Sequence, residues 1–73
     1  MKNDVEYIEK IDKYIRTHYK SDLKKMNGLL CLFKCNIDKI EQINKVEDFD
    51  LKFNQAKGYE TELLNIINKV KCE

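Results

Sequence analysis

The most apolar stretch of this 73-residue chain runs from Leu29 to Phe33, five consecutive apolar residues near the middle of the sequence. It lies within a longer pattern whose apolar residues are spaced alternately three and four positions apart, as in a helix with one buried stripe. Asn27 and Gly28 can end a helix, but the pattern keeps its phase across them and favours continuity. We therefore predict a central helix over about residues 22–46. The pattern consists of Leu23, Met26, Leu30, Phe33, Ile37 and Ile40.

Two further helices are predicted on either side, over about residues 4–20 and 49–71. In the first, apolar residues occupy one half of the helical surface and charged residues the other half. In the last, Phe49, Phe53, Ala56, Leu63, Ile67 and Val70 recur at helical spacing. Gly58 lies inside this helix at a cost of about 1 kcal/mol relative to Ala, so a kink or a break there stays open.

These elements predict one small helical domain over residues 1–73. The expected fold class is all-α, either an antiparallel three-helix bundle or a helical hairpin plus a helix. β-Structure is a minor alternative, because Asn27-Gly28 suits a hairpin turn but its flanks do not alternate with period two. A chain of this size rarely forms a core worth more than about 3–5 kcal/mol, which favours completion of the fold by dimerisation.

The central helix also carries a second apolar group on the side opposite to its main stripe. A helix with two opposed apolar faces is buried on both sides, either by the helices of its own chain or by a second chain. Small residues in this group would let another helix approach closely. We therefore predict a partner or dimer interface formed by Gly28, Cys31, Leu32, Cys35, Ile43 and Val46.

The candidates for site chemistry are one histidine and three cysteines: His18, Cys31, Cys35 and Cys72. They are the ligand types of a zinc site, but a three-helix arrangement places them too far apart to converge. The expected state of the cysteines is free thiol, and His18 is expected to be a packing residue. No residues have the spacing of a catalytic pair or a phosphate-binding loop. We predict no enzymatic activity, no metal, no cofactor and no small-molecule substrate.

The charge pattern limits the classes of partner. The net charge is +1, so no general attraction to nucleic acid or anionic membrane is expected. A helix-turn-helix at Gly28 would place Leu29–Phe33 in the DNA groove, which is unsuitable. No segment has the length of a membrane span. Residues 1–6 lack the hydrophobic region of a signal peptide, which indicates a cytoplasmic protein.

The sequence thus predicts a small cytoplasmic interaction module, acting by binding a partner protein and existing as a homodimer. An inhibitor, an adaptor or an antitoxin-like regulator would fit this description. The alternative is a nucleic-acid-associated regulator of transcription or of a plasmid or phage, whose binding would be salt-dependent.

Overall fold

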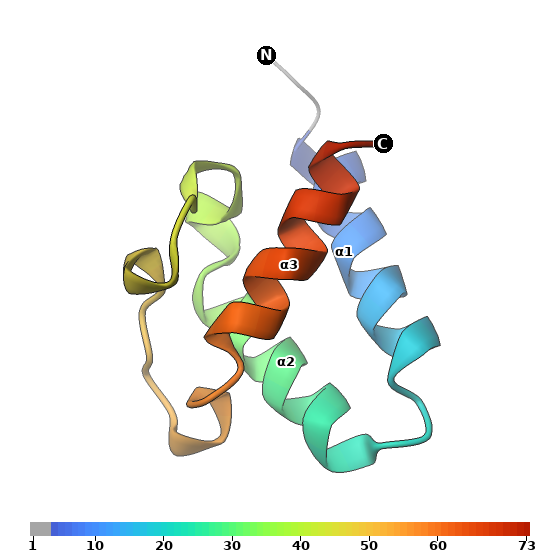
Figure 1. Ribbon diagram of the computed structural model, residues 1–73, viewed down its shortest axis with the longest axis vertical. Helices are drawn as coiled ribbons and strands as arrows, with labels where there is room; N and C mark the ends of the chain where they lie inside the picture. Colours follow the sequence, from blue (N-terminus) through green and yellow to red (C-terminus); the bar gives the residue numbers. More distant parts are fainter. Residues whose placement is uncertain (1–3) are drawn as a thin grey trace.

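The computed structural model describes residues 4–73, so the first three residues of the N-terminal segment lie outside it. The described residues form α1 (Asp4–His18), α2 (Leu23–Cys35) and α3 (Glu60–Lys71), shown in Figure 1. Between α2 and α3 lie three short 3-10 helices: η1 (Ile37–Gln42), η2 (Val46–Asp48) and η3 (Asn54–Ala56). These residues contain no strand, and the predicted all-α class is confirmed.

The three α-helices pack against one another pairwise around a shared core. α1 and α3 lie side by side and run in opposite directions, while α2 crosses below them (Figure 1). η3 packs against α2, so the long connection between α2 and α3 also covers the core. The buried apolar side chains are those of Ile11, Ile15, Leu29, Leu30, Leu32, Phe33, Ile40, Ile43, Phe49, Ala56, Leu63, Ile66, Ile67 and Val70.

The central helix is shorter than predicted. α2 passes through Gly28 without a break, as expected, but it ends at Cys35 and not near residue 46. At Asn36 the backbone leaves the helical conformation, with φ −122° and ψ 20°, and the Asn36 side chain donates a hydrogen bond to the Leu32 carbonyl oxygen at 2.9 Å. Asparagine side chains compete in this way with the backbone for helix carbonyls. The next apolar residues are therefore presented by η1, a 3-10 helix.

The prediction of a helix over residues 49–71 is wrong for its first half. Residues 49–53 lie outside any helix, Phe49 and Phe53 have extended backbone angles, and α3 begins only at Glu60. Gly58 adopts a φ of +96°, a conformation that residues with a Cβ rarely adopt. Its N–H donates to the Glu60 Oε1 atom at 3.0 Å. The break at Gly58 left open by the sequence is therefore present.

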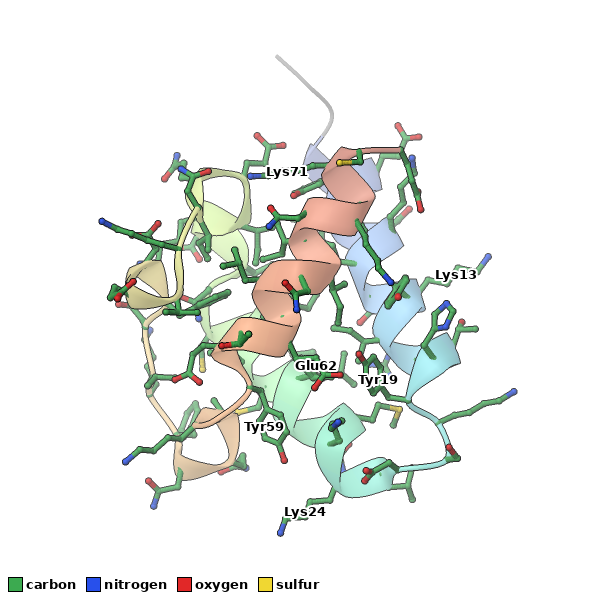
Figure 2. All side chains as sticks on the ribbon, in the orientation of Figure 1. Lys13, Tyr19, Lys24, Tyr59, Glu62 and Lys71 are labelled. Atoms are coloured by element: carbon green, nitrogen blue, oxygen red, sulfur yellow. The ribbon has the colours of Figure 1, made fainter. Side chains whose placement is uncertain are left out.

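A polar cluster joins the adjoining ends of the three α-helices. The Tyr19 hydroxyl, just after α1, donates to the Glu62 Oε2 atom on α3 at 2.5 Å. Lys25 of α2 forms an ion pair with the same carboxylate at 3.2 Å and lies over the Tyr19 ring. Figure 2 shows Tyr19 and Glu62 pointing toward each other. The Tyr19 hydrogen bond, followed by Lys25, lowers the pKa of the Glu62 carboxyl.

This cluster predicts an acid-sensitive contribution to stability. Because the pKa of Glu62 is lower in the folded chain, its contribution is present above the unfolded pKa of about 4.3 and is lost as the pH falls through the folded pKa. From about pH 6 to about pH 3, wild type should therefore lose more free energy of unfolding than Glu62→Gln or Tyr19→Phe. Urea unfolding at each pH measures the difference. Tyr14→Phe, which changes another tyrosine on α1, should keep the wild-type profile. Equal profiles for wild type and Glu62→Gln would contradict the assignment.

Candidate functional site

The predicted interface residues do not form one exposed face. Gly28, Leu32 and Ile43 are buried, while Cys31, Cys35 and Val46 are half-buried. The members on α2 are covered from elsewhere in the same chain, because α1, α3 and η3 all pack against α2. Ile43 and Val46 lie beyond the end of α2, next to η1 and at the start of η2. The second apolar group of α2 therefore does not require a second chain for its burial.

Tyr59 explains why a glycine lies in the middle of α2. Its ring occupies the space that a Cβ at position 28 would need. Gly28 permits a close approach to α2, as the sequence suggests. The approaching group is the Tyr59 ring of the same chain and not a helix of a second chain. Tyr59 immediately precedes α3, so this contact fixes the start of α3 against α2.

The histidine and the cysteines lie apart. His18 is exposed and stacks on Tyr14, with 4.1 Å between ring centroids. Cys31 and Cys35 lie one turn apart on α2, and Cys72 is exposed after the end of α3. Burial, followed by the proximity of Cys35, raises the pKa of the Cys31 thiol. Among the described residues, no three His, Cys, Asp or Glu side chains lie close enough to hold a metal ion.

Two large apolar side chains are exposed close together in the connection between η2 and η3, residues 49–53, which we call the 49–53 segment. Leu51 is 46% exposed and Phe53 is 57% exposed. Val5, Leu23 and Ile37 are the other exposed large apolar residues of the described chain, but only here do two occur within three positions. The segment runs along the outer edge of the molecule on the side away from α1 (Figure 1). Neighbouring exposed apolar side chains of this kind are typical of interaction sites.

Asn36 fixes the position of this segment. Its side-chain amide donates from Nδ2 to the Asp50 carbonyl oxygen at 3.0 Å and accepts at Oδ1 from the Asp50 N–H at 2.7 Å. The residue is 1% exposed. Both backbone groups of Asp50 are thus held from the inner side, much as a neighbouring strand would hold them. The exposed side chains at positions 51 and 53 therefore lie on a positioned segment and not on a free loop.

Both ends of the 49–53 segment are also anchored. The Asp48 carboxylate accepts backbone hydrogen bonds from Asn44 at 2.9 Å and Lys45 at 3.3 Å. The bond from Asn44 is the main reason why the pKa of Asp48 is lowered. Phe49 and Ala56, on either side of the exposed residues, are buried in the core.

The outer edge of the segment has unused backbone groups. In an extended chain, successive residues direct their N–H and C=O groups to opposite sides. Because the groups of Asp50 bond to Asn36, this alternation directs those of Leu51 to the opposite, outer side. Within residues 4–73 no hydrogen bond uses the Leu51 N–H or C=O, the Phe53 N–H or the Phe49 C=O. Such an edge can pair with another chain.

The charged residues of the segment are Asp50 and Lys52, one on each side of Leu51. The Asp50 carboxylate lies 3.4 Å from the Lys39 ammonium, and both side chains are solvent-accessible. An exposed pair of this kind contributes little to stability. Because Asn36 holds the backbone of Asp50, the position of the segment does not depend on this charge.

A signal for the segment was present in the sequence. Residues 49–53 read Phe-Asp-Leu-Lys-Phe, an alternation of apolar and charged residues with the period of two that indicates an extended strand. The helical spacing of Phe49, Phe53 and Ala56 competes with this pattern. The interpretation as a helix followed that spacing and missed both the extended segment and the role of Asn36.

Comparison with known proteins gives no relative from which a function could be transferred. No protein-family model, no curated protein and no solved structure matches this chain. None of the helices described here is long and apolar enough to cross a membrane.

The anchoring role of Asn36 predicts a large loss of stability in Asn36→Ala. The change leaves the backbone groups of Asp50 and the Leu32 carbonyl without their partners, and we expect a loss of about 2 kcal/mol or more. Urea unfolding followed by circular dichroism measures it. Asn68→Ala, which removes an exposed asparagine on α3, should change the stability by less than about 0.5 kcal/mol. Equal stabilities of the two variants would contradict the role of Asn36.

The contact between Gly28 and Tyr59 predicts that Gly28→Ala has opposite effects in two backgrounds. In the wild type, the added methyl group displaces the Tyr59 ring, and we expect a loss of about 1 kcal/mol. In Tyr59→Ala the space is open, so the better helix propensity of alanine should stabilise the chain by up to about 1 kcal/mol. A double-mutant cycle measures the coupling. The same effect in both backgrounds would show that Tyr59 does not constrain position 28.

Proposed function

We propose that this chain is a protein-binding module whose contact surface is the 49–53 segment, and that it self-associates as a homodimer. It acts by occupying a surface of another protein chain, as an inhibitor, an adaptor or an antitoxin-like regulator would. The observation that carries the proposal is the exposure of Leu51 and Phe53 on a segment that Asn36 holds in place.

The anchoring supports binding because it reduces the cost of association. A flexible loop loses conformational freedom when it binds, and a segment that is already ordered loses less. Here the inner side of Asp50 is fully hydrogen-bonded and the segment is anchored at both ends. An apolar side chain on such a support can enter a pocket of a partner without first being ordered.

The small size of the segment sets the expected strength of self-association. Stable protein interfaces bury roughly 1,200–2,000 Å² in total, and five residues supply only part of such an area. We therefore expect a weak dimer, with a dissociation constant on the order of 10 μM to 1 mM. Measurements must reach this concentration range.

Self-association of the purified chain tests the proposal. Wild type, examined by sedimentation equilibrium up to about 1 mM, should show a monomer–dimer equilibrium. The Leu51→Ser/Phe53→Ser double variant should remain monomeric, because it removes the exposed apolar groups and leaves the Asn36 anchor unchanged.

The control is Leu23→Ser, since Leu23, at 62%, is more exposed than Leu51 or Phe53 but lies at the start of α2, outside the segment. It should associate like the wild type. A wild type that stays monomeric throughout, or a Leu23→Ser variant that loses association as strongly as the double variant, would contradict the proposal.

A further inference from the structure

We infer that two copies of this chain pair through the outer edges of their 49–53 segments, antiparallel and centred on Leu51. This inference rests on the proposed homodimer and adds its geometry. In this pairing Leu51 lies opposite Leu51 of the second copy, and Asp50 lies opposite Lys52 of the second copy.

The direction of the backbone groups selects Leu51 as the centre. In an antiparallel pair, residues opposite each other exchange both hydrogen bonds only where their N–H and C=O groups face the partner strand. Those of Asp50 face inward to Asn36, so those of Leu51 face outward. A twofold axis between the two Leu51 residues lets each N–H donate to the C=O of the other.

The next backbone groups along the edge, those of Phe49 and Phe53, include one free donor and one free acceptor that can pair between the two copies. With Leu51 at the centre, Phe53 lies opposite Phe49 of the second copy. The Phe53 N–H and the Phe49 C=O have no hydrogen bond within residues 4–73, whereas the Phe49 N–H donates to Val46 and the Phe53 C=O accepts from Ala56. Each Phe53 N–H can therefore donate to the Phe49 carbonyl of the second copy. The twofold axis makes four interchain hydrogen bonds in all, and the pairing stops there.

The charges of the segment are self-complementary in this register. Position 50 lies opposite position 52 of the second copy, so each Asp50 meets a Lys52 and the pair occurs twice. The Asp50 carboxylate, already paired with Lys39 of its own chain, then lies between two lysines. Opposite charges that face each other across two strands stabilise the pairing, and like charges destabilise it. A parallel pairing in register would instead place Asp50 opposite Asp50 and Lys52 opposite Lys52. The charge order therefore favours the antiparallel arrangement.

The apolar side chains gather on the other face of the paired segments. Leu51 and Phe53 lie on the same side of an extended chain because they are two positions apart. The twofold axis brings both leucines together and places each Phe53 diagonally beside Leu51 of the second copy. The pairing thus covers the two side chains whose exposure is otherwise unexplained.

Charge exchange tests this register. Asp50→Lys gives two Lys–Lys pairs, and Lys52→Asp gives two Asp–Asp pairs. Each single variant should dimerise about tenfold or more weakly than the wild type by sedimentation equilibrium. The Asp50→Lys/Lys52→Asp double variant restores both opposite-charge pairs, as does an equimolar mixture of the two single variants. Both should dimerise within about threefold of the wild type.

Two controls accompany these variants. Lys57→Asp makes the same change of net charge as Lys52→Asp at an exposed position outside the segment, and should leave dimerisation within about threefold of the wild type. Circular dichroism should show the same helix content in every variant, because Asn36 bonds to the backbone of Asp50 and not to its carboxylate.

The outcomes separate this inference from the proposed function. If the single charge variants dimerise like the wild type while Leu51→Ser/Phe53→Ser does not, the register is wrong and the segment remains the interface. The register is also wrong if the single variants weaken association but neither the double variant nor the mixture restores it. If the wild type does not associate at all, the proposed homodimer and the register fail together.

Discussion

The hydrogen bonds of one buried side-chain amide, that of Asn36, determine how the second half of this chain is arranged. Its Nδ2 atom donates to the Leu32 and Asp50 carbonyl oxygens, and its Oδ1 atom accepts from the Asp50 N–H. The first bond ends α2, and the other two hold an extended segment against that end. Since a buried amide without partners costs about 1–3 kcal/mol, the three bonds stabilise only the arrangement that satisfies all of them.

The burial of α2 follows from this arrangement. Because α2 stops at Cys35 and the chain turns back, the connection that follows can return over the helix through η3 and Tyr59. The same connection leaves Leu51 and Phe53 on the outside. In a chain of 73 residues, the surface available for a partner is thus a consequence of how the core is closed. We place the interaction surface on the segment that closes the core and not on the helix that forms its centre.

The helices could be predicted wherever local pattern and tertiary packing agree. α1 was predicted to within two residues at its C-terminal end, and α2 was expected to continue through Gly28, as it does. The prediction was wrong at Asn36 because Ile37 and Ile40 continue the helical spacing into η1. The Asn36 side chain instead bonds to the Leu32 carbonyl and ends α2, while its other hydrogen bonds join the distant Asp50. The opposed apolar faces of α2 indicated burial on both sides, but spacing alone does not distinguish a second chain from a returning loop. The free edge at Leu51 could not be predicted, because it depends on the hydrogen bonds between Asn36 and Asp50. The apolar spacing within a single segment carries no information about such a distant contact.

Amide hydrogen exchange tests most directly whether Asn36 holds Asp50 and whether the Leu51 edge pairs with a second copy. Exchange at Asp50 and Leu51 is followed by NMR at low and high protein concentration. In dilute solution the Asp50 amide should exchange slowly, because Asn36 accepts its hydrogen bond, and the Leu51 amide should exchange rapidly. As the concentration rises through the dissociation constant of the dimer, exchange at Leu51 should slow while exchange at Asp50 stays slow. Rapid exchange at Asp50, or exchange at Leu51 that is slow in dilute solution or independent of concentration, would contradict the account.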